Sequence, residues 1–273
     1  MNVRDNILVN SDMKWFCFPL LCLVLYVNNY NTAMAQISFG GTPVSFIDTS
    51  GYLQPANMIQ TIVMPSVDNN VLKNEDEIEL NDTTFMRPSA VGLPINVNLN
   101  ITNAGTWETL PDGAKIWRLH IISDSAKFIM LFFNQFWLPN DAKLFIYNDD
   151  KSIVLGAFTE DNNQTHQKFT TGPIKGQSIY LEYYEPITAI QQGKINISYV
   201  GHLYNPGFGD SESCHNNVIC SKAIAWCNQR RSVSIILTLD ISNNRIRWCT
   251  GALINNTSYN LTPYILTANH CLD

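Results

Sequence analysis

The chain has 273 residues, of which 45% are hydrophobic and 15% are charged, and its formal net charge is −6. This length is enough for one large domain or two small ones. The sequence contains no basic stripe, so its mild acidity argues against a nucleic acid or an anionic membrane surface as a partner.

The N-terminal residues have the pattern of a secretion signal. An apolar run extends from Trp15 to Val27, and the small-x-small pattern Ala33-Met34-Ala35 follows it, as signal peptidases require. The run is shorter than the roughly 20 residues of a membrane-spanning helix. We therefore expect residues 1–35 to be a leader and signal peptide, removed near Gln36, and the mature chain to be secreted, extracellular or periplasmic, with no membrane contact. An interfacial helix or anchor is the alternative.

Residues 36–93 are predicted to be an extended lead-in. They contain Gly40-Gly41-Thr42-Pro43, Pro55 and Pro65 and show little sustained periodicity. The longest run of like charge in the chain, Glu75-Asp76-Glu77, is interpreted as a solvated face of this lead-in. No segment of the chain holds helical periodicity for more than two turns.

From about residue 94 the sequence alternates apolar and polar side chains, as half-buried strands do. Turn clusters such as Pro111-Asp112-Gly113 separate short segments rich in β-branched and aromatic residues. This texture predicts an antiparallel β-sandwich over residues 94–203. Its expected strands are residues 95–101, 115–122, 128–136, 143–147, 152–157, 178–184 and 194–200.

The cysteines indicate a boundary near residue 210. Cys17 and Cys22 fall in the predicted signal, and the other five lie in the last 60 residues: Cys214, Cys220, Cys227, Cys249 and Cys271. In an oxidising compartment these residues predict disulfides, and their odd number leaves at least one thiol without a partner in the chain. A Gly-, Pro- and Ser-rich linker, residues 204–213, precedes three more strand-like segments at 231–239, 247–254 and 264–268.

Two of those segments carry the chemistry. Cys249-Thr-Gly-Ala-Leu-Ile-Asn-Asn256 and Tyr264-Ile-Leu-Thr-Ala-Asn-His-Cys271 resemble the histidine region of chymotrypsin-fold serine endopeptidases. The insertion Asn255-Asn256-Thr257 and the motif Ala268-Asn-His-Cys271 resemble the bacterial lysyl-endopeptidase-like branch. Residues 208–214 resemble the junction at which the catalytic domain of that branch begins. Several segments within residues 105–158 resemble its propeptides.

The resemblance implies that His270 is the catalytic general base and that Cys249 and Cys271 form a disulfide beside it. A serine hydroxyl is a weak nucleophile at neutral pH and needs an imidazole within hydrogen-bonding reach. The family order of His, Asp and Ser places the other two members after His270, so this chain alone is expected to be inactive. The implied substrate is a protein or peptide, cleavage after lysine is an analogy only, and neither a cofactor nor a metal is implied.

Two other patterns are set aside. Gly209-Asp210-Ser211 resembles the nucleophile motif of these enzymes, but Glu212 and Ser213 replace the glycines that shape the oxyanion hole. It is therefore assigned to the linker. A zinc site at Cys214, His215, Cys220 and Cys227 lacks paired Cys-x-x-Cys knuckles, and disulfides are the expected use of these cysteines.

The sequence therefore predicts an all-β chain with an antiparallel β-sandwich propeptide and, over residues 214–273, an incomplete trypsin-like β-barrel. The predicted function is the N-terminal portion of a secreted trypsin-like serine endopeptidase precursor. Because about 60 residues bury too little core to complete a barrel, the C-terminal segment is expected to stay loose. The alternative is a non-catalytic secreted β-sandwich with a binding or structural role, or a decayed protease gene.

Overall fold

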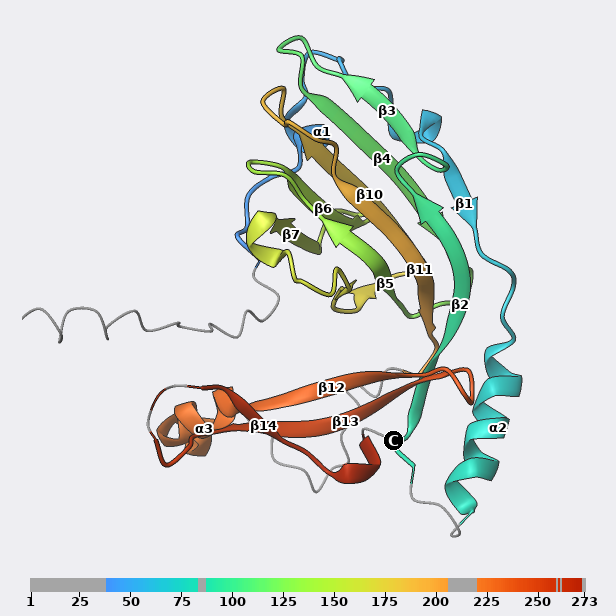
Figure 1. Ribbon diagram of the computed structural model, residues 1–273. Helices are drawn as coiled ribbons and strands as arrows, with labels where there is room; N and C mark the ends of the chain where they lie inside the picture. The colour runs from blue at the N-terminus through green and yellow to red at the C-terminus, as the bar shows by residue number, and fades with distance from the viewer. Residues whose placement is uncertain (1–37, 83–86, 206–219, 259, 261, 272–273) are drawn as a thin grey trace, which may run out of the picture. The chain divides into compact units, whose positions relative to one another are not determined.

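Two β-sheets form the core of the computed structural model, which describes residues 38–273 except 83–86, 206–219, 259, 261 and 272–273 (Figure 1). The chain is mostly β, and neither sheet closes into a barrel, so the all-β prediction is confirmed. The proposed signal peptide and most of the proposed linker lie outside the described residues. In the described part of the chain, no helix is long and apolar enough to cross a membrane.

The first sheet has six strands in the order β1-β4-β10-β6-β7, and β3 also pairs with β4. Only the β1–β4 pair is parallel; the other pairs are antiparallel. The strands are β1 (Thr61–Val63), β3 (Thr106–Thr109), β4 (Lys115–Ile122), β6 (Lys143–Asn148), β7 (Val154–Phe158) and β10 (Ser178–Glu185).

The second sheet has eight strands in the order β12-β13-β2-β11-β5-β8, with β14 paired to β13 and β9 paired to β5. All of its pairs are antiparallel. The strands are β2 (Ala90–Asn100), β5 (Phe128–Trp137), β8 (Phe169–Thr170), β9 (Ile174–Lys175), β11 (Lys194–Leu203), β12 (Val233–Asp240), β13 (Arg245–Ile254) and β14 (Tyr264–Leu266).

Helices are few and short in the described residues. The α-helices are α1 (Val44–Ile47), α2 (Asn69–Asn81) and α3 (Cys227–Ser232). Short 3-10 helices occur at η1 (Ala56–Met58), η2 (Glu160–Asn162), η3 (Ser221–Trp226) and η4 (Asn269–Cys271).

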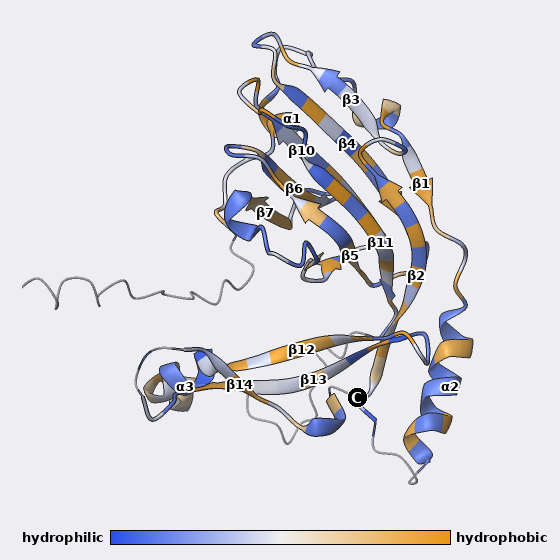
Figure 2. Cartoon of the chain, viewed as in Figure 1, coloured by the Kyte–Doolittle hydropathy of each residue, from blue (hydrophilic) through white to orange (hydrophobic). Residues whose placement is uncertain are grey.

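The main core lies between the two sheets, as the alternating sequence pattern requires. Along β4, Trp117, Leu119 and Ile121 are fully buried and belong to the same cluster as Ile129 and Leu131 of β5. The alternation appears in Figure 2 as orange and blue bands along β4 and β10. Each fully buried side chain of this size contributes about 1.5–3 kcal/mol relative to exposure. The period-2 pattern therefore fixes which face of each strand enters the core.

The lead-in covers part of the opposite face of the first sheet. Arg118, on the outer face of β4, donates from Nε and Nη2 to Oε2 of Glu108 at 2.9 and 2.5 Å. The backbone of Gln54 completes the group, because its N–H donates to Glu108 and its carbonyl accepts from Arg118. Both charged side chains are almost fully buried. These contacts attach the lead-in to the sandwich and leave neither buried charge unpaired.

Helix α2 is a difference from the sequence analysis, which expected an extended lead-in. Its N-terminus is capped by Asp68, whose carboxylate accepts from the backbone N–H groups of Asn70 and Val71. The acidic run at residues 75–77 lies inside this helix and is not an extended linker face. The sequence pattern did not predict this helix because its contacts with the rest of the chain are largely polar, so its apolar residues show only weak helical periodicity.

The C-terminal segment also differs from expectation, because the structure orders it as an extension of the second sheet. Strand β13 pairs with β2 through Ile246 opposite Gly92 and Arg247 opposite Ala90. Ile246 is fully buried in a second apolar cluster with Val91, Met130, Phe132 and Leu203. Strand β2 begins at residue 90, earlier than predicted, and this extra length supplies the edge on which β13 pairs.

Candidate active site

The two histidine-region motifs lie side by side in the second sheet. Strand β13 carries the first motif, and β14 pairs with it antiparallel, with Ala252 opposite Leu266 and Ile254 opposite Tyr264. Beyond β14, the Thr267 hydroxyl donates to the carbonyl of Thr250 at 2.9 Å. The strand pairing thus brings residues 267–271 back to the strand that holds Cys249.

Gly251 allows β12, β13 and β14 to approach closely. A Cβ atom at this position would lie 2.8 Å from Cδ1 of Ile236 in β12 and 2.9 Å from Cγ2 of Ile265 in β14. Gly251 was not among the predicted site residues. A glycine in the interior of a strand-like segment is the signal that marks such a close approach.

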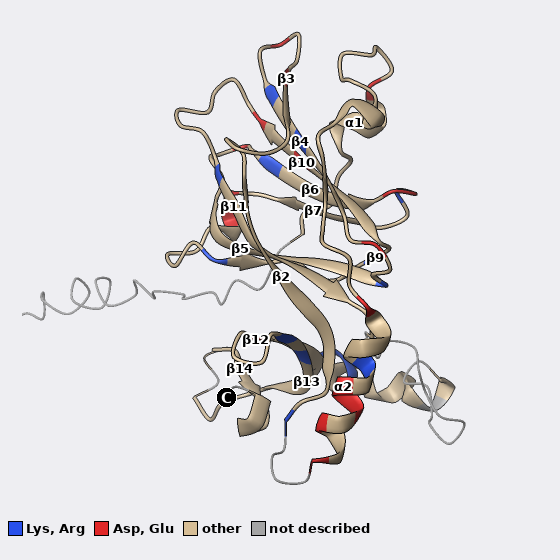
Figure 3. Ribbon diagram, turned by 90° about the vertical axis from the view of Figure 1, so that its right-hand side faces the viewer, with Lys and Arg blue, Asp and Glu red and all other residues tan. Residues whose placement is uncertain are grey.

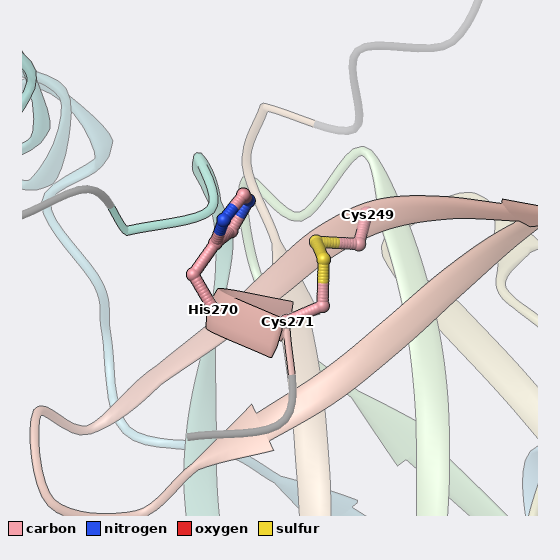
Figure 4. A group of neighbouring side chains, drawn as sticks. All are labelled: Cys249, His270 and Cys271. Atoms are coloured by element: carbon pink, nitrogen blue, oxygen red, sulfur yellow. A yellow bond between two sulfur atoms is a disulfide. The ribbon is translucent and has the colours of Figure 1, made fainter. Parts of the chain in front are cut away.

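A disulfide fixes the end of the second motif to the first. Cys249 of β13 and Cys271 of η4 are bonded, with their Cα atoms 6.1 Å apart (Figure 4). This is the pairing that the resemblance implies. Both residues are buried. Since Cys271 directly follows His270, the bond restrains the backbone at the histidine.

The His270 imidazole lies next to this disulfide and is exposed. A ring nitrogen of His270 and the two sulfur atoms all lie within 4.8 Å of one another, and the ring stands on η4 beside the bridge (Figure 4). Among the described residues, no side chain or backbone group forms a hydrogen bond with the ring. The structure therefore brings together the three predicted site residues, and within the part of the chain that it describes neither a carboxylate nor a serine bonds to the imidazole.

The same three residues satisfy the distances of a metal site, but their chemistry does not fit one. Zinc is bound by thiolate sulfur, and both sulfur atoms here are consumed by the disulfide. Of the alternative zinc ligands, Cys214 and His215 lie outside the described residues. Cys220 and Cys227 are described as free thiols.

Other histidines have structural surroundings. His202 is fully buried, with Nδ1 2.8 Å from Oγ of Ser123 and Nε2 2.8 Å from Oδ1 of Asn69, and burial lowers its pKa. His120 stacks on Tyr180 with ring centroids 4.1 Å apart. The exposed His166 lies in a loop and accepts from the backbone of Lys168. None of these rings adjoins the disulfide.

Removing the disulfide is expected to loosen the histidine segment. The bridge spans 22 residues, for which chain entropy predicts a contribution of about 3 kcal/mol. In a Cys249→Ala, Cys271→Ala variant, backbone amides of β14 and η4 should exchange with deuterium about 100-fold faster, as mass spectrometry measures. Cys227→Ala, which removes a free thiol, serves as the control. Unchanged exchange in the double variant would show that strand pairing alone holds the segment.

Comparison with protein families finds one match in the C-terminal part of the chain. Residues 208–273 match the family model of the lysyl endopeptidase C-terminal domain. The match includes both motifs and η4. No solved structure matches the chain.

Proposed function

We propose that the chain is the N-terminal portion of a secreted serine endopeptidase precursor, because its residues 208–273 match the family model of the lysyl endopeptidase C-terminal domain. In this proposal residues 1–35 direct export, the sandwich of residues 94–203 is a propeptide, and residues 214–273 begin the catalytic domain. The substrate is a protein or peptide. The placement of His270 beside the Cys249–Cys271 disulfide, within the family match, is the observation that carries the proposal.

His270 acts as the general base in this proposal. Its ring is exposed and therefore accessible to a reacting group, while the adjacent disulfide and the β13–β14 pairing restrain its backbone. A restrained imidazole can take the proton of a serine hydroxyl as that oxygen attacks a carbonyl carbon, and can later return it to the leaving amine. The aspartate that orients the ring, and the serine itself, are assigned to sequence that follows the histidine motif.

Exposed apolar side chains on the C-terminal strands support this assignment. Val233 of β12 and Leu266 of β14 both pair with Ala252 of β13, so with Ile235 they share one face of the sheet, and the three side chains are 61%, 62% and 49% exposed. Contiguous apolar surface of this kind is typical of a face that further protein covers. A trypsin-like barrel, in which these strands pair and pack with others, supplies such a cover.

The reading frame after codon 273 provides the test. We expect it to remain open and to encode an aspartate followed by Gly-Asp-Ser-Gly-Gly. The chain extended through this frame should hydrolyse a lysyl or arginyl peptide ester, whereas the 273-residue chain should not. An in-frame stop would overturn the proposal and favour a non-catalytic secreted β-sandwich. Hydrolysis by the 273-residue chain that His270→Ala abolishes would contradict the assignment of aspartate and serine to later sequence.

A further inference from the structure

The acidic face of α2 contacts two arginines of the C-terminal hairpin, defined here as β12, β13 and the turn between them. Glu79 lies four residues after Glu75 and three after Asp76 along α2, so its side chain shares a face of the helix with both. Arg245 and Arg247 are two apart in β13 and point to one side of the strand. Figure 3 shows acidic segments of α2 beside basic segments of the chain, and the hydrogen bonds between the two join residues about 170 positions apart in sequence.

Arg247 is the more buried of the two arginines. Its Nη1 and Nη2 atoms donate to the two carboxylate oxygens of Glu79 at 2.9 and 2.8 Å, a forked pair. Its Nε donates to Asp240 of the same hairpin, and Nη1 also donates to the carbonyl of Pro88. The Arg247 side chain is only 4% exposed. The bonds from Arg247 lower the pKa of Glu79, so this carboxylate stays ionised at neutral pH.

Arg245 adds a second ionic contact one turn earlier on the helix. Its Nη2 donates to Glu75 at 2.6 Å and its Nε to Asp76 at 3.3 Å. The other oxygen of Asp76 accepts from the hydroxyl of the buried Tyr204, which follows β11. The first residue of α2, Asn69, is bonded to the sandwich through His202 and the carbonyl of Ser125. Helix α2 is therefore bonded both to the sandwich and to the hairpin.

Backbone and apolar contacts extend the same interface. The N–H of Trp248 donates to the carbonyl of Ser89, next to the β2–β13 ladder. The Ile246 side chain packs directly against Gly201 of β11. A Cβ atom built at Gly201 would lie 2.8 Å from Cδ1 of Ile246. Because Ile246 is fully buried there, close apolar packing holds the hairpin in addition to the ion pairs.

We propose that α2, together with residues 88–92 at the start of β2, is a docking surface that keeps the lead-in and sandwich bound to the hairpin when the chain between them is cut. The proposal rests on the proposed function only in naming the hairpin as part of a peptidase. Cleavage between residues 205 and 220 then yields a non-covalent complex. Release of the propeptide requires loss of the contacts of Glu75, Asp76 and Glu79 with the two arginines.

The test uses the full chain carrying a site for a sequence-specific protease between residues 205 and 220. After cutting, the two pieces are expected to elute together in size-exclusion chromatography. Truncating one partner of a buried, hydrogen-bonded charge pair weakens binding strongly, so Arg245→Gln with Arg247→Gln should raise the Kd of the pieces at least about 30-fold. Arg231→Gln, at an exposed position of α3, is the control and should leave the Kd unchanged. Separation of the wild-type pieces, or an unchanged Kd in the double variant, would overturn the proposal.

A second variant, on the helix side, keeps the test decisive if the arginine variant folds poorly. Glu79→Gln preserves the side-chain shape and removes the charge that Arg247 contacts. It should raise the Kd about 10-fold while the circular dichroism of the chain stays unchanged, and an unaltered Kd contradicts the docking surface. Both measurements report binding and need no peptidase activity. If the chain extended through the downstream reading frame is inactive while the cut pieces stay together, only the proposed function is refuted. If the extended chain is active while the cut pieces separate, only the docking surface is refuted.

Discussion

Alanine in place of His270 is expected to lower kcat/KM of the chain extended through its catalytic serine by at least about 10⁴-fold, as loss of the general base does in serine peptidases. Without the imidazole, the serine hydroxyl has no acceptor for its proton at neutral pH. The measurement is the hydrolysis of a lysyl ester, with single-turnover kinetics to separate the chemical step from binding. KM should change little, because the base acts mainly in the transition state.

His166→Ala is the matched control for this substitution. Both rings are exposed, but His166 lies in a loop of the sandwich and bonds only locally. Its replacement should leave kcat/KM within about twofold of the parent, because surface substitutions of this kind change little. If His270→Ala kept most of the activity, the general base would have to lie elsewhere, and the proposed role of the motif would be wrong.

Replacing Arg118 with leucine is expected to destabilise the sandwich by about 3–5 kcal/mol, because it leaves the buried carboxylate of Glu108 without its charged partner. Glu108 would keep only the backbone N–H of Gln54 as a partner, and the carbonyl of Gln54 would lose its donor. Urea denaturation followed by tryptophan fluorescence measures the change in the free energy of unfolding. The lead-in around Gln54 should also become more sensitive to limited proteolysis.

Two variants show whether the unpaired charge causes the loss. Lys115→Leu, on the same strand but exposed, should change the free energy of unfolding by about 0.5 kcal/mol or less. Arg118→Leu combined with Glu108→Leu removes both charges and should recover much of the stability. Equal losses in the single and double variants would point instead to a packing defect at position 118.

Local sequence predicted the longer strands well. Residues 115–122 were expected to form a strand and form β4 with the same bounds, and the expected strands at 143–147 and 178–184 differ from β6 and β10 by one residue. Alternation over six or more residues is a strong signal, because one face must enter the core. The short strands β1, β3, β8 and β9 were missed, since two to four residues cannot display a period.

The candidate site was predictable in part. The two motifs predicted Cys249, His270 and Cys271 as site residues, and the structure brings these residues together through the disulfide and the β13–β14 pairing. The contribution of Gly251 was not foreseen, because its neighbours Ile236 and Ile265 become adjacent only when the three strands pair. Burial of Arg118 beside Glu108 was likewise invisible in a sequence where each reads as an ordinary strand residue.

By itself, the sequence determined the all-β character of this protein and the inward face of each long strand, because these depend on residues within a few positions of one another. Only the tertiary structure decided that the acidic run near residue 76 belongs to a helix and that this helix holds Arg245 and Arg247. The physical reason is distance along the chain. A carboxylate in an isolated segment is best solvated by water, and it becomes a buried partner only when the fold brings a guanidinium from about 170 residues away.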